Sequence, residues 1–114
     1  MSENFNKYHI SEKTAELLEK LGFSWRYKPF ATKIGNKVYN QVVLNDQLPT
    51  LEEAQRWLRE VKHEVVLVDA KAIDIYEVHI LGRNGSTKLF RTYEAALEEG
   101  INLAAKILIK NHGR

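Results

Sequence analysis

The 114-residue chain contains no cysteine, only two prolines and no long run of hydrophobic residues. The lack of cysteine excludes a disulfide framework, a thiolate metal site and a cysteine nucleophile. No apolar run approaches the roughly 20 residues that a membrane-spanning helix needs, and the start, MSENFNKYH, lacks the apolar core of a signal peptide. We therefore expect a soluble cytoplasmic protein with no membrane partner.

The remaining composition is that of an ordinary globular protein. Hydrophobic residues make up 44% of the chain and charged residues 28%, which argues against wholesale disorder. A chain of this length fits one domain that can bury a core without covalent staples. We expect a single domain over residues 1–114, with flexible ends at residues 1–9 and 111–114.

Three segments have the pattern of amphipathic helices that begin at a capping residue. The hydroxyl of Ser11 can accept a hydrogen bond from an unpaired backbone N–H at the start of a helix over residues 11–21. Thr50 precedes Glu53 by three positions, which is the capping-box spacing, and an apolar stripe follows it. Thr92 stands before the third helix in the same way.

The third predicted helix carries the longest apolar stripe, so we expect it to be the central one. Gly100 lies on this stripe. Glycine costs roughly 1 kcal/mol relative to alanine inside a helix. Its position therefore predicts close contact with a neighbouring strand or helix.

Five further segments have strand-like patterns. Phe23, Trp25 and Tyr27 alternate with polar residues at the period of two that a strand requires. The other four segments are residues 37–44, 64–69, 72–81 and 87–91. The dipeptides Gly35-Asn36 and Asn84-Gly85 are typical of hairpin turns. The order α-ββ-α-βββ-α predicts a two-layer α+β fold, in which three helices cover one face of an antiparallel sheet of about five strands.

The sequence contains no enzyme signature, so we expect neither catalysis nor a cofactor. No two of the four histidines have the i, i+3 or i+4 spacing of a local metal-ligand pair. Glu77 and His79 share one strand face, which is compatible with a metal or proton-transfer pair, but a solvated polar face is the favoured interpretation. Asp69 and Asp74 flank a predicted turn, where structural roles are typical of aspartate.

A candidate protein-binding patch lies on the second predicted helix. Arg56, Trp57 and Arg59 have the composition of an interface hot spot. The alternative is a tryptophan that covers the edge of the core, with arginine stems packed beside it. A small interaction module that binds a protein partner or itself is the first functional hypothesis.

A candidate nucleic-acid site lies on the first predicted hairpin. Its four basic residues, with no acidic residue between positions 23 and 38, are Arg26, Lys28, Lys33 and Lys37. Such cations can neutralise phosphates, although lysines on edge strands also serve to block aggregation. A nucleic-acid-binding accessory protein is therefore the second hypothesis.

Three motifs, taken in order, resemble those of a protein family. They are A-x-L-L-x-x-x-G-F (15–23), P-T-x-x-x-A-x-x-W-L-R-E (49–60) and T-Y-E-x-A-L-E-x-G (92–100). The pattern resembles a family of small uncharacterised proteins from gut anaerobic bacteria and their phages or mobile elements. This family implies no established activity, and Ala95 stands where an acidic residue is more usual. Residues 76–105 are loosely similar to the arm-type DNA-binding domains of phage integrases.

Overall fold

The computed structural model describes residues 8–44, 47–83 and 88–112, and the side chains of all of these except 27–30, 42–44 and 112. The elements in chain order are α1 (Glu12–Lys20), β1 (Tyr27–Ile34), β2 (Lys37–Leu44), α2 (Leu51–Val61), β3 (Val66–Ala72), β4 (Ile75–Ile80) and α3 (Tyr93–His112). The α+β class is thus confirmed, with three helices and two two-stranded antiparallel sheets.

All three helices begin at the predicted capping residues. The hydroxyl of Ser11 accepts a hydrogen bond from the backbone N–H of Thr14 at 3.2 Å. Thr50 and Glu53 form a complete capping box, with bonds of 3.0 and 2.9 Å. Thr92 caps α3 by accepting from a backbone N–H in its first turn at 3.1 Å. These bonds satisfy amides that have no partner within the helix.

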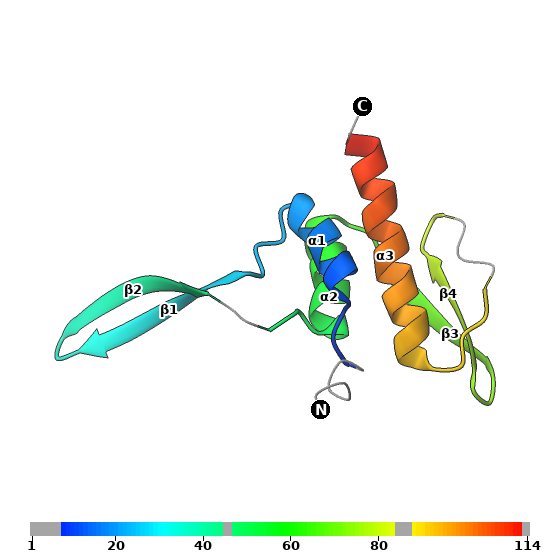
Figure 1. Ribbon diagram of the computed structural model, residues 1–114, viewed down its shortest axis with the longest axis horizontal. Coiled ribbons are helices and arrows are strands. Elements are labelled where there is room, and N and C mark those ends of the chain that lie inside the picture. Colours follow the sequence, from blue (N-terminus) through cyan, green and yellow to red (C-terminus); the bar gives the residue numbers. More distant parts are fainter. Residues whose placement is uncertain (1–7, 45–46, 84–87, 113–114) are drawn as a thin grey trace.

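Helix α3 occupies the centre of the folded body. It lies between α1 and α2 on one side and the β3–β4 sheet on the other (Figure 1). The apolar residues that α3 buries are Ala96, Leu97, Ile101, Ala104, Ala105 and Leu108. The predicted central role of this helix is confirmed. The predicted two-layer arrangement is wrong, because α1 and α2 pack on α3 rather than on a sheet.

Gly100 marks the closest approach of α3 to the sheet, as its place on the apolar stripe predicts. A β-carbon built on Gly100 would lie 2.5 Å from side-chain carbons of both Val66 and Val78. Real β-carbons do not come so close to other carbons. Glycine is therefore required here by packing, since it lets the helix backbone rest directly on the two valines.

The β3–β4 sheet has one face on α3 and one face exposed. Val66 pairs with Ile80 and Val68 with Val78, and these residues point toward the helix. The predicted strand over 87–91 is not found in its described part, residues 88–91, where Phe90 alone pairs, in an isolated bridge to Tyr76. The Thr92 cap follows two residues later, which limits the ladder on the C-terminal side of Phe90. The predicted Asn84-Gly85 turn lies outside the described residues.

Strands β1 and β2 form a separate sheet, which we call the arm (residues 27–44). The arm projects away from the body, and its strands pair only with each other among the described residues (Figure 1). The radius of gyration is 16.6 Å, whereas a compact chain of this length has about 13 Å. The predicted single sheet of about five strands is therefore wrong, because the two hairpins never meet.

The aromatic alternation that predicts a strand at residue 23 has another cause. Phe23 stacks on Trp57 with ring centroids 4.9 Å apart. Trp25 is buried, and its indole N–H donates to the carbonyl of Ala15 at 3.0 Å. Phe23 thus contacts α2 and Trp25 bonds to α1. The strand β1 begins only at Tyr27.

Described elements reach into both predicted flexible ends, residues 1–9 and 111–114. His9 forms a bridge with Thr50, and α3 continues to His112. The rest of the predicted flexible ends, residues 1–7 and 113–114, lies outside the described residues. Within the described ranges, no helix combines the length and hydrophobicity that crossing a membrane requires.

Candidate functional site

The arm is a regular antiparallel hairpin in which all eight residues of each strand are paired. Lys33 lies opposite Val38, and Ile34 lies opposite Lys37. Because side chains of directly opposed residues share a face and successive residues alternate, this register fixes the two faces of the arm. Within the described part of the chain, no third strand or helix covers either face.

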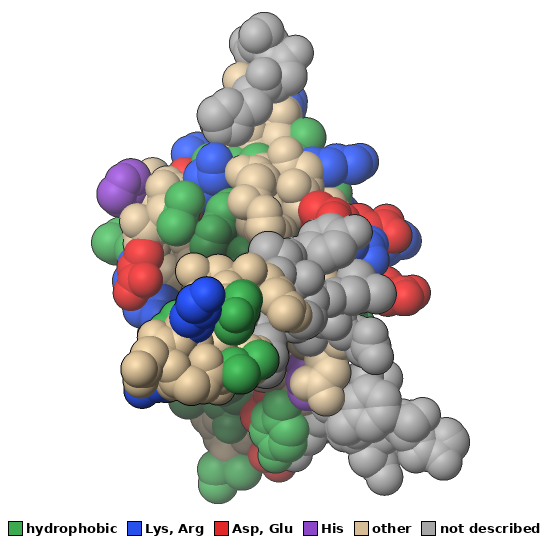
Figure 2. All heavy atoms as spheres, turned by 90° about the vertical axis from the view of Figure 1, so that its left-hand side faces the viewer, with side chains coloured by type: hydrophobic (Ala, Val, Ile, Leu, Met, Phe, Trp, Pro, Cys, Tyr) green, Lys and Arg blue, Asp and Glu red, His purple; other side chains and the backbone are tan. Residues whose placement is uncertain are grey.

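One face of the arm presents exposed apolar side chains. Ile34 and Tyr39 lie on this face together with Lys37, and they are 64% and 46% exposed. Val38, on the opposite face, is 59% exposed. Figure 2 looks at the molecule from the side of the arm and shows hydrophobic side chains next to a basic one at its near end. An amphipathic surface of this kind is typical of a binding site.

The structure does not bring the four predicted nucleic-acid residues into one patch. Lys33 and Lys37 are exposed near the turn, but their register puts them on opposite faces of the arm. Arg26 precedes the arm, where its guanidinium bonds both carboxylate oxygens of Glu19 at 2.9 and 3.0 Å and lies over Trp25. The side chain of Lys28 lies outside the described part of the structure.

The predicted protein-binding patch is divided by the packing of its tryptophan. Trp57 is half-buried against Phe23, and Lys62 lies 5.8 Å from the centre of the Trp57 ring. Arg56 and Arg59 are exposed. This geometry matches the alternative in which Trp57 covers the edge of the core.

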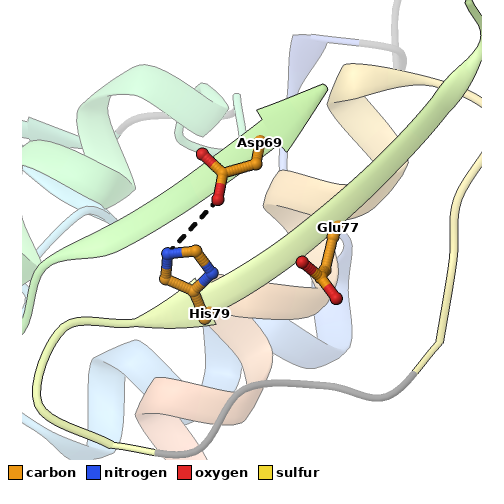
Figure 3. A group of neighbouring side chains, drawn as sticks. All are labelled: Asp69, Glu77 and His79. Atoms are coloured by element: carbon orange, nitrogen blue, oxygen red, sulfur yellow. Dashed lines mark ion pairs between the residues drawn. The ribbon is translucent and has the colours of Figure 1, made fainter. Parts of the chain in front are cut away.

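The exposed face of the β3–β4 sheet brings three ionisable side chains together. Asp69 lies directly opposite Glu77, and His79 follows two residues later on the same face. Figure 3 shows the imidazole of His79 turned toward Asp69, with Nε2 and Oδ2 3.6 Å apart. One ligand atom from each of the three residues lies within 4.8 Å of the other two.

Sequence reasoning identifies two members of this cluster and misses the third. The period of two places Glu77 and His79 on one face of a strand. Asp69 joins them only through the register of the hairpin, which is fixed by the turn at Asp74 and by the burial of the inner valines. Lys71 also reaches the cluster, with its Nζ 3.2 Å from Oε1 of Glu77.

Two polar clusters within the body have structural partners. Glu64 is nearly buried, and it binds Arg83 through two bonds of 3.1 and 2.8 Å. The hydrogen bond and charge of Glu64 raise the pKa of Arg83 above its usual value. Between α1 and α3, the buried Thr14 hydroxyl donates to Glu98 and accepts from Asn102. These bonds hold secondary structure together rather than frame an open site.

Comparison of the chain with models of protein families, with curated proteins and with solved structures finds no match. The resemblance to small proteins of gut anaerobes and their mobile elements therefore stays a prediction.

Proposed function

We propose that this protein is a small, non-enzymatic interaction module that associates with a second copy of itself through the arm. The observation that carries the proposal is the exposure of Ile34 and Tyr39 on one face of a hairpin that projects from the body. An isolated two-stranded hairpin is only marginally stable in water. Contacts with a partner would supply the packing that the arm lacks within its own chain.

The distribution of charge favours a second copy as the partner. The arm carries three lysines and no acidic residue, so all 15 carboxylates of the chain lie outside it. The rest of the chain holds these 15 acidic residues against 14 of the 17 Lys and Arg, so it is nearly neutral, and a basic arm can find acidic partners only there. If each arm contacts the other chain in the same way, the result is a closed two-fold dimer.

Size-exclusion chromatography with light scattering, at two concentrations at least tenfold apart, tests this proposal. The wild-type chain is expected to be a dimer whose fraction grows with concentration. The variant Ile34→Thr/Val38→Thr/Tyr39→Thr keeps side chains that favour strands and is expected to be monomeric. Ile73→Thr removes a 91% exposed apolar side chain from the β3–β4 turn and is the matched control. A wild-type chain that stays monomeric at both concentrations contradicts the proposal.

Nucleic-acid binding is the alternative, and the absence of any carboxylate from the arm favours it. The relevant residues on the arm are Lys28, Lys33 and Lys37. Phosphate contacts make affinity fall with salt by roughly one log unit per log of salt for each phosphate neutralised. A gel shift with duplex DNA at low salt, lost in Lys33→Gln/Lys37→Gln, would favour this function over self-association. The absence of any shift at low salt would exclude it.

A further inference from the structure

We propose that Asp69, Glu77 and His79 form a binding site for one divalent transition-metal ion, with Zn²⁺ as the reference ion. The three side chains come from the exposed face of the β3–β4 sheet, opposite the face that packs on α3. Their ligand atoms already lie within 4.8 Å of one another (Figure 3). The site is separate from the arm and does not depend on the proposed function.

The distance between Asp69 and His79 fits two ligands of one ion. Metal–ligand bonds of about 2.0–2.2 Å in a tetrahedral zinc site place two ligand atoms roughly 3.4 Å apart. Oδ2 of Asp69 and Nε2 of His79 are 3.6 Å apart. An ion can therefore bridge these two atoms with only a small side-chain adjustment.

The backbone holds the carboxylates in a position that a cation stabilises. Asp69 and Glu77 are direct partners in the antiparallel ladder, and like charges directly opposite each other destabilise a sheet. Lys71 relieves this repulsion in part, since its ammonium group contacts Glu77. A divalent ion between all three side chains would neutralise both carboxylates at once.

The donor set selects the class of ion. Two carboxylates alone suit Mg²⁺, Ca²⁺ or Mn²⁺, whereas an imidazole nitrogen favours zinc and its transition-metal neighbours. The side chains of Asp69, Glu77 and His79 remain 50%, 36% and 35% exposed. Three protein ligands on an open face leave a further coordination position for water, as in open zinc sites.

A substitution of Lys71 distinguishes this site from nonspecific metal binding to the protein surface. The ammonium group of Lys71 contacts Oε1 of Glu77 at 3.2 Å, so it competes with a metal ion for the negative charge of this carboxylate. Lys71→Met is therefore expected to bind zinc more tightly than wild type. Lys106→Met removes one positive charge from an exposed position on α3 and is the matched control for net charge.

The experiment is calorimetric titration of the tag-free, chelator-treated chain with ZnCl₂, with visible absorption of added CoCl₂ as a second readout. Wild type is expected to bind one equivalent. His79→Ala and Asp69→Asn are expected to lose more than about tenfold in affinity, because even residues outside the ligand set typically contribute that much. His63→Gly removes a histidine elsewhere and should bind as wild type does. Circular dichroism confirms that each variant is folded.

Several results would overturn the proposal. They are a wild-type chain that takes up no zinc, equal zinc affinities for His79→Ala and His63→Gly, and a Lys71→Met chain that binds no more tightly than Lys106→Met. Each is distinguishable from failure of arm-mediated association, because the oligomeric state is measured on the metal-free chain.

Discussion

The carboxylate of Glu98 on α3 accepts a hydrogen bond from the hydroxyl of Thr14, which lies 84 positions earlier on α1. Thr14 is fully buried and polar, a combination that globular proteins allow only where hydrogen bonds compensate for lost water. This bond therefore fixes how α1 sits on the central helix.

Thr14→Val is expected to destabilise the protein, although it preserves the shape of the side chain. The change leaves Glu98 without one donor and Asn102 without its acceptor, which costs about 1–3 kcal/mol in the free energy of unfolding. Urea denaturation followed by circular dichroism measures the loss. Thr14→Ser keeps the hydroxyl and should lose distinctly less. Equal losses in the two variants would contradict a role for the hydrogen bonds.

Gly100→Ala is expected to lower the free energy of unfolding by about 1–3 kcal/mol, the range for overpacking a core. The new methyl group would clash with Val66 and Val78, and this clash outweighs the gain in helix propensity. Val78→Ala removes one of these two close contacts. In a double-mutant cycle, the pair should therefore be more stable than the sum of the single changes predicts. Additive effects would contradict the close approach of α3 to the sheet.

His63→Gly is expected to stabilise the protein by about 1 kcal/mol. His63 follows α2 with a φ of 60°, a left-handed conformation that disfavours residues with a β-carbon. The thermal midpoint should rise accordingly. Because the side chain is exposed, no packing is lost. A lower midpoint would mean that the imidazole makes a stabilising contact.

Trp57→Ala separates the two interpretations of the Arg56–Trp57–Arg59 patch. Since Trp57 stacks on Phe23, we expect a loss of about 2 kcal/mol in stability, below the range for a fully buried tryptophan. The oligomeric state should not change. Light scattering of the folded variant checks this, and a loss of self-association without a loss of stability would assign the patch to an interface.

Amide hydrogen exchange is expected to divide the chain into two parts. In the free monomer, the amides of β1 and β2 should exchange through local opening, because the arm pairs only with itself among the described elements. The amides of α3 should exchange only through global unfolding. The proposed dimer predicts that arm protection rises with concentration. Protection of the arm equal to that of α3 in dilute monomer would contradict this division.

The sequence predicts those features that depend on neighbouring residues. Ser11, Thr50 and Thr92 begin helices because a cap acts within one turn. The separation of the two hairpins is not predictable in this way, since strand patterns do not specify partners. The alternation of Phe23 and Trp25 is equally local, but the side chains serve contacts with the helices rather than a strand.

In the candidate sites, too, features set by neighbouring residues are predicted and features set by distant ones are not. Alternation places Glu77 and His79 together, while Asp69 joins them through pairing across the hairpin. Arg26 is a residue type that often contacts phosphates, yet its guanidinium is bound by Glu19 of the preceding helix, α1. The exposure of Ile34 and Tyr39 also has no local signal, because apolar residues in a strand usually indicate a buried face.

The central place of α3 has a consequence during synthesis. This helix is the last of the described elements in chain order, and both α1 and the β3–β4 sheet rest on it. As the chain leaves the ribosome, Leu18 and Leu58 therefore have no complete surface to pack on until residues beyond 92 emerge. Assembly has to await these residues, and contacts that join such distant positions slow folding.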